Sequence, residues 1–159
     1  MTAGVSKSPI YLVEWQQDLM RDILNRIIPA SGGFPGAGDL DVTGYIDAAV
    51  GRSAESKRLF GEGLAQIQVA SGALGAEAFA TLSNAKKDAV LRQVESRCPA
   101  FFQALVRHTY EGYYTNPKIA KLLGPGVRPP QPLGHDVEHG NLGLLENVKK
   151  RGRVYREAT

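Results

Sequence analysis

The spacing of apolar residues constrains this chain more than any other feature of its sequence. Between residues 9 and 123 these residues recur every three or four positions, which places them on one face of successive α-helices. No segment shows the sustained alternation of apolar and polar residues that is typical of a half-buried β-strand. We therefore predict an all-α fold, a compact bundle of about five to six helices.

Prolines, glycines and capping residues divide this region into elements. The first helix is expected to open at Pro9, with Ser8 as its cap, and to end before Pro29. Its apolar face is expected to consist of Leu12, Trp15, Leu19, Ile23 and Ile27. Further helices are expected over residues 42–50 and from Ser53, Ser83, Pro99 and Pro117, with Phe79 and Leu82 as a short apolar plug.

Residues 124–159 differ in character from this helical domain at residues 9–123. Prolines at positions 125, 129, 130 and 132 favour an extended, polyproline-like backbone. Only one or two turns of amphipathic helix are expected there, at residues 142–148. The sequence thus predicts a single helical domain followed by an extended C-terminal arm that wraps around a partner.

The composition is that of a globular protein and excludes several classes of function. With 43% hydrophobic and 22% charged residues, the chain has enough apolar side chains to form a core. A net charge of +3 does not predict nucleic-acid binding, and no apolar run is long enough for a membrane span. The lone Cys98 has no His or Asp close to it in sequence that could act as a base for a catalytic thiol.

One short motif resembles a metal site. Residues 135–139 read HDVEH and match the H-x-x-E-H pattern of zinc peptidases, in which two histidines lie one helical turn apart. Here His135 and His139 follow the prolines and lie between two glycines, without an apolar helical stripe. We therefore interpret them as residues of a polar tail, and we predict neither a metal site nor catalytic residues in this chain.

Three tyrosines near the end of the fifth helix are the better candidates for function. Tyr110, Tyr113 and Tyr114 cannot all face one core, because residues next to each other on a helix diverge by about 100°. Tyrosine is enriched at protein–protein interfaces, and proline segments lose little entropy on docking. We predict that a partner protein contacts these tyrosines together with Pro129, Pro130, Gln131 and Pro132, and that Arg153 and Tyr155 in the basic C-terminal segment add a second contact.

The same residues carry a resemblance to a known family. Three parts of the sequence carry it, and they follow one another along the chain. They are LNRIIPASGGFPGAGDLDVTGYID, then FGEGLAQIQ with AFATLS, and then the aromatic helix FFQALVRHTYEGYYTNP. With PPQPLG and LLENVKKRGRVYRE in the tail, they cover most of residues 12–156. In this order and spacing, the chain resembles the gluconate 2-dehydrogenase subunit 3 family, the small subunits of flavin-dependent sugar dehydrogenases.

The resemblance implies a partner and a role. Members of this family pair with a large subunit of the glucose–methanol–choline type, which holds FAD and oxidises a sugar or sugar acid. The small subunit supports folding, solubility, maturation or export of that partner, and it carries no cofactor itself. A cytochrome c is a candidate electron acceptor of such a complex.

Many members of the family carry a twin-arginine export signal, which this sequence lacks. We therefore expect the complex in the cytoplasm, or in the periplasm if a signal has been removed. Two other functions remain open at this point. One is a stand-alone helical adaptor domain whose tail binds another protein, and the least favoured is a small zinc hydrolase that uses His135 and His139.

Overall fold

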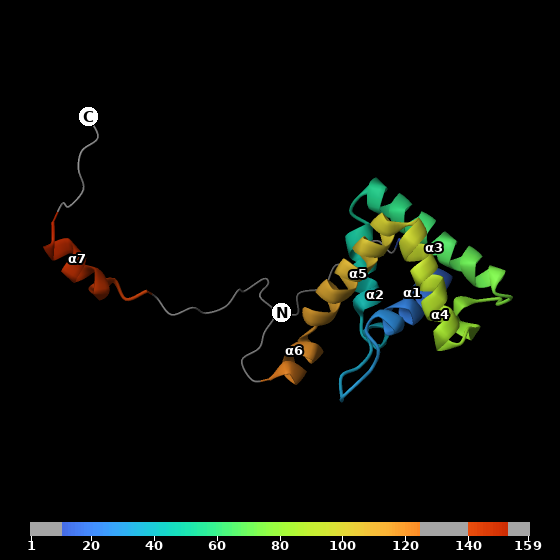
Figure 1. The fold of residues 1–159 in the computed structure, drawn as a ribbon, viewed down its shortest axis with the longest axis horizontal. Helices are drawn as coiled ribbons and strands as arrows, with labels where there is room; N and C mark the ends of the chain where they lie inside the picture. The colour runs from blue at the N-terminus through green and yellow to red at the C-terminus, as the bar shows by residue number, and fades with distance from the viewer. Residues whose placement is uncertain (1–10, 125–139, 153–159) are drawn as a thin grey trace, which may run out of the picture.

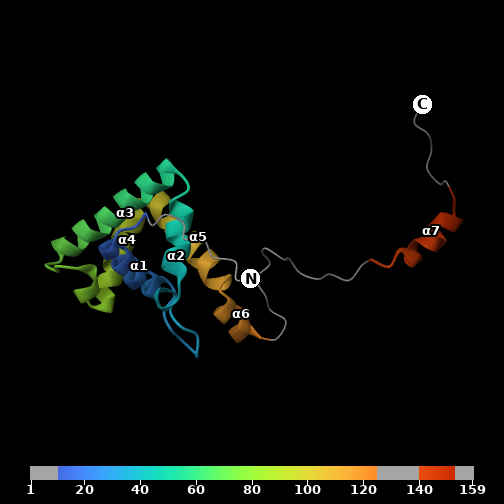
Figure 2. The same ribbon diagram turned by 180° about the vertical axis from the view of Figure 1, so that it is seen from behind.

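The computed structural model describes residues 11–124 and 140–152, and within these ranges the fold is all-α, as predicted. Figures 1 and 2 show its helical body from two opposite sides. The α-helices are α1 (Glu14–Ile27), α2 (Val42–Val50), α3 (Ala54–Ala73), α4 (Asn84–Arg97), α5 (Pro99–Tyr114), α6 (Pro117–Leu123) and α7 (Glu146–Lys150). Short 3₁₀ turns are η1 (Ala37–Asp39), η2 (Phe79–Thr81) and η3 (Leu142–Leu145).

Helix α1 begins later than the sequence predicts. The expected start at Pro9 is wrong, because residues 11–13 are not helical and α1 begins at Glu14. The backbone N–H groups of Tyr11 and Leu12 instead donate to Oδ1 of Asp47 on α2, at 2.9 and 2.7 Å. This buried carboxylate holds the segment in a non-helical path, so that Leu12 reaches the core from outside the helix.

The later start also changes the apolar face of α1. The prediction that Trp15 belongs to that face is wrong, since its side chain is 50% exposed. The helix instead buries Leu19, Met20, Ile23 and Leu24. Residues 11–13 were predicted to be helical, and the hydrogen bonds of Tyr11 and Leu12 to Asp47 hold them outside the helix instead.

The glycine-rich loop after α1 is held in place by side-chain hydrogen bonds. Oδ1 of Asn25 accepts from the backbone N–H of Gly38 at 2.8 Å, and its Nδ2 donates to Asp39 at 3.1 Å. The backbone N–H of Ala37 also donates to the carbonyl of Ile28 at 3.0 Å. These hydrogen bonds hold the glycine-rich loop in one conformation, and the loop leads directly into α2.

Most of the remaining boundaries follow the predicted signals. Ser53 caps α3 by accepting a hydrogen bond from Ser56, and Asn116 caps α6 by accepting one from Lys118. The predicted apolar plug is present, because Phe79 in η2 and Leu82 after it are both buried. Ser83 precedes α4 as expected, although its side chain makes no capping hydrogen bond.

Helix α5 packs against five other helices, which are α1, α2, α3, α4 and α6. Figures 1 and 2 show it leading from the body to α6. Where α5 crosses α3, the ring of Phe101 lies directly against Gly63. A Cβ at Gly63 would overlap the ring carbons of Phe101, so this crossing requires a glycine. The Phe101 ring also meets Phe60 edge to face, with the ring centroids 5.3 Å apart.

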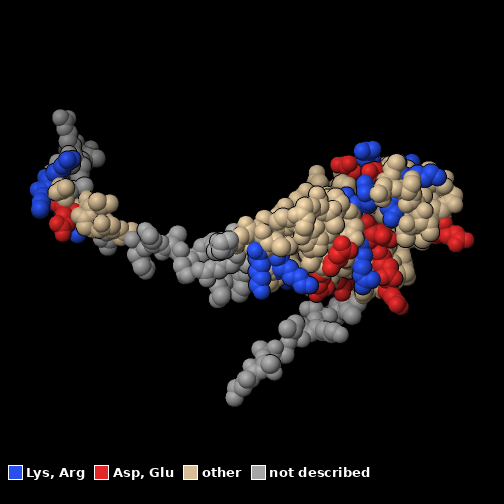
Figure 3. All heavy atoms as spheres, turned by 90° about the horizontal axis from the view of Figure 1, so that it is seen from below, with Lys and Arg blue, Asp and Glu red and all other residues tan. Residues whose placement is uncertain are grey.

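Among the described residues, no helix is both long enough and apolar enough to cross a membrane. Positive and negative side chains are interspersed over the body on the side shown in Figure 3, so no charge of a single sign dominates that side.

We predict opposite effects for two glycine substitutions in α3. Gly63→Ala forces a methyl group into the Phe101 ring and should cost about 1–3 kcal/mol of unfolding free energy. Gly72→Ala meets no atom within 4 Å and should add about 0.5–1 kcal/mol, because alanine favours a helix over glycine. Denaturant titration of both variants measures this, and equal effects would contradict the close α3–α5 contact.

Candidate interaction surface on helix α5

Helix α5 presents an outer ridge that is formed by Phe102, Val106, Tyr110 and Tyr114. These side chains are four residues apart, so they follow one another along the same side of the helix. Phe102 and Val106 are half-buried, and Tyr110 and Tyr114 are 46% and 49% exposed. The inner face of α5 buries a different set, which is Phe101, Leu105, Thr109, Gly112 and Tyr113.

The two exposed tyrosines form a stack. The ring centroids of Tyr110 and Tyr114 are 6.0 Å apart, and the ring planes differ by only 16°. Tyr114 also meets the ring of Tyr113 edge to face at 5.2 Å. The aromatic surface is therefore ordered by contacts within the chain before any partner binds, which lowers the entropy cost of binding.

Tyr113 has a different position from its neighbours. The sequence predicts an interface role for all three tyrosines, but the side chain of Tyr113 is 3% exposed and lies in the core. Its hydroxyl donates a hydrogen bond to the carbonyl of Pro35 at 2.9 Å, which ties α5 to the loop before α2. Burial, and secondly the nearby Tyr114, raises the pKa of the Tyr113 phenol above its usual value. Tyr113 is therefore a core residue against which the exposed Tyr114 ring packs.

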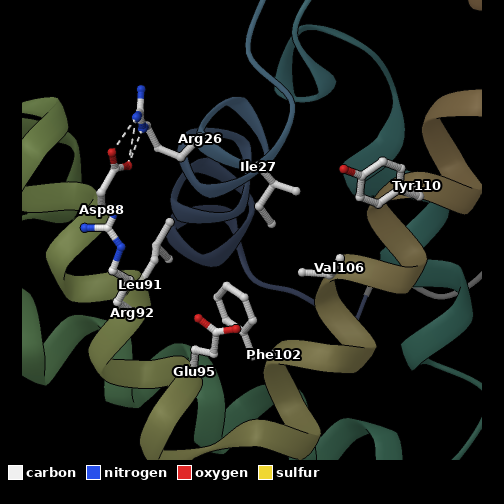
Figure 4. Close-up of a pocket in the computed structure, with 9 residues that line it drawn as sticks. All are labelled: Arg26, Ile27, Asp88, Leu91, Arg92, Glu95, Phe102, Val106 and Tyr110. Atoms are coloured by element: carbon white, nitrogen blue, oxygen red, sulfur yellow. Dashed lines mark hydrogen bonds and ion pairs between the residues drawn. The ribbon is translucent and has the colours of Figure 1, made fainter.

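A groove lies beside the outer ridge, between α1, α4 and α5 (Figure 4). It has a volume of about 390 Å³. Its lining residues are Arg26, Ile27, Asp88, Leu91, Arg92, Glu95, Phe102, Val106 and Tyr110. Three of these residues belong to the outer ridge, so the groove and the tyrosine stack form one continuous surface.

An ion pair connects α1 and α4 at the edge of this groove. The guanidinium of Arg26 donates to both carboxylate oxygens of Asp88, from Nε at 2.9 Å and from Nη2 at 2.8 Å. Lys87 and Asp22 form a second, longer pair between the same helices at 3.7 Å. The bidentate geometry fixes the relative position of the two helices and hence the width of the groove.

A polar cluster lies on the α2 side of α5. Glu111 accepts a hydrogen bond from the hydroxyl of Tyr45 at 3.4 Å and also contacts Nδ1 of His108 at 2.8 Å. Desolvation of the Tyr45 phenol, followed by the negative charge of Glu111, raises the pKa of Tyr45. The ring of His108 is half-buried against Phe60 and Tyr45. The cluster links α2 to α5.

Several predicted site residues lie outside the described residues. These are Pro129, Pro130, Gln131, Pro132, Arg153 and Tyr155 of the predicted interface, and His135 and His139 of the HDVEH motif. The short helix expected near residues 142–148 is present as η3 followed by α7, and Leu144 in η3 is 75% exposed. Within residues 11–124 and 140–152, no three His, Cys, Asp or Glu side chains are grouped as metal ligands would be.

Nothing in the sequence alone predicts the groove. Arg26 and Asp88 are 62 residues apart, so nothing local predicts that they pair. The four-residue spacing from Phe102 to Tyr114 is visible in the sequence, but spacing alone does not tell which side of a helix faces solvent.

Comparison with known proteins identifies the family. The family model described as gluconate 2-dehydrogenase subunit 3 matches residues 14–124, which contain helices α1 to α6. The chain belongs to the gluconate 2-dehydrogenase subunit 3 family. Membership of a subunit family implies a complex with other subunits, and it is consistent with the resemblance seen in the sequence. No curated protein and no solved structure matches the chain.

We predict that Tyr113→Phe destabilises the fold by about 0.5–1.5 kcal/mol, because the carbonyl of Pro35 loses its donor. The raised pKa means that the wild-type fold keeps this phenol protonated while the unfolded chain releases the proton. Stability should therefore fall as the pH rises above about 10, and the variant should lack this contribution.

The matched control is Tyr114→Phe, whose exposed hydroxyl has no hydrogen bond to another described residue. It should change the unfolding free energy by less than about 0.5 kcal/mol. Denaturant titrations at neutral and alkaline pH measure both variants. Equal stability of the two would contradict the buried role of Tyr113.

Proposed function

We propose that this chain is the non-catalytic small subunit of an FAD-dependent sugar dehydrogenase. Its partner is a large subunit of the glucose–methanol–choline type, which holds the flavin and oxidises a CH–OH group of the sugar. Electrons then pass from the flavin to an external acceptor, for which a cytochrome c is the candidate. The match to a family of gluconate 2-dehydrogenase subunits supports this proposal.

The observation that carries the proposal is the exposed tyrosine stack within the matched region. Tyr110 and Tyr114 together present two large, ordered aromatic rings to solvent. Tyrosine is among the residues that most often dominate binding energy at interfaces, because its ring buries a large area at low entropy cost. Such a pair on the outside of a folded domain is well suited to contact with a second subunit.

The C-terminal arm supplies the second part of the proposed interface. Residues 124–159 follow α6 and carry the prolines that favour an extended backbone. An extended arm that follows a large partner buries more of the partner's surface than the helical body can reach alone. This contact is how the small subunit would support folding, solubility and maturation of the flavoprotein.

Deletion of residues 125–159 tests the role of the arm. The truncated chain keeps α1 to α6 and their core, so its helical circular dichroism and thermal transition should resemble those of the full chain. It should no longer co-purify with the flavoprotein partner, because the arm contact is lost. A truncated chain that still yields an intact, active complex would defeat the proposal for the arm.

A further inference from the structure

The groove between α1, α4 and α5 has the features of a site for one helix of a partner protein. Its floor is apolar, with Ile27, Phe102 and Val106 only half-buried by the chain itself. Residues four apart on a helix form a ridge, and in the commonest helix packing such ridges of two helices interdigitate, each lying in a groove of the other. The outer ridge of α5 is of this kind, and it spans about 18 Å from Phe102 to Tyr114.

The charged side chains at the edge of the groove indicate which charges a binding partner would need. Arg26 and Asp88 already satisfy each other. Arg92 and Glu95 lie on α4 one helical turn apart, and no ion pair joins either of them to another described residue. The four charges sum to zero, which does not suit a polyanion such as nucleic acid or an anionic membrane surface. A partner helix with both an acidic and a basic side chain would match this edge.

We propose that this groove and the tyrosine stack together hold one amphipathic helix of the flavoprotein partner. This proposal rests on the proposed function and names the surface on which the two subunits meet. The partner helix carries apolar side chains at i and i+4 that pack between the outer ridge and α4. Beside them it presents a carboxylate to Arg92 and a basic group to Glu95.

The continuity of the groove with the tyrosine stack supports a single occupant. Tyr110 lines the groove and also stacks on Tyr114, so a helix that follows the ridge contacts both features. The Arg26–Asp88 pair holds α1 and α4 at a fixed spacing, so the groove exists before binding. A preformed apolar groove with flanking charges is the usual receptor for an amphipathic helix.

Site-specific photo-cross-linking of the full-length chain in complex with its flavoprotein tests the proposal. The photoreactive residue p-benzoylphenylalanine replaces Tyr110 or Arg92 in the groove, and Val69 on the exposed side of α3 as the control. Tyr110 is close to this residue in shape and is half exposed, so the fold should tolerate the change. We expect cross-links from the two groove positions to one helical peptide of the flavoprotein, and none from position 69.

Other occupants give distinguishable results, and each would overturn the proposal. These are cross-links to residues 125–159 of the same chain, cross-links to a second copy of the chain, or cross-links to a non-helical segment of the flavoprotein. An intact, active complex with no cross-link from the groove also overturns it, while leaving the proposed function in place. Failure of the unmodified chain to form any complex would instead overturn the proposed function.

Charge reversal provides a second readout. Arg92→Glu and Glu95→Lys should each weaken the affinity for the flavoprotein by about tenfold or more, since each places like charges together at the interface. The control is Arg58→Glu on α3, where an exposed ion pair with Glu62 contributes little. Unchanged affinity in both groove variants would contradict the predicted charge pattern of the partner helix.

Discussion

The contact of Phe101 with Gly63 sets the position of α5, and the rest of the surface depends on it. Because the ring lies directly on the α3 backbone, α5 cannot move outward without opening a cavity in the core. At the other end of α5, the hydrogen bond from Tyr113 to Pro35 fixes the rotation of the helix about its axis. With both ends held, Phe102, Val106, Tyr110 and Tyr114 have only the outside of the molecule to face.

The ion pairs between α1 and α4 position the groove that lies beside the outer ridge of α5. The Arg26–Asp88 pair joins α1 to α4 beside α5. Half-buried residues of these three helices line the groove. The exposed aromatic rings thus lie on a rigid support whose core residues are buried independently of any partner. A surface of this kind loses little conformational freedom when a second subunit covers it.

The periodicity of the sequence was sufficient to predict the fold class, because helical spacing and proline or glycine breaks are local signals. It failed at the start of α1, where the distant carboxylate of Asp47 holds residues 11 and 12 outside the helix. It also failed at Trp15, which lies in α1 but is half exposed. The spacing of the tyrosines predicted that at least one lies at the surface, but only the packing shows which of them is buried. The groove depends on residues far apart in sequence. The predicted contacts of the arm at residues 129–132 and at Arg153 and Tyr155 remain predictions.

We propose that the exposed face of α5 holds a flavoprotein in its soluble, flavin-loaded form. The most direct measurement is the yield of soluble flavoprotein with bound flavin when it is co-expressed with this chain or with its Tyr110→Ala, Tyr114→Ala variant. Both side chains lie outside the core, so the variant should fold normally. We predict that the variant gives a markedly lower yield than the wild-type chain. An equal yield from the folded variant would contradict the account.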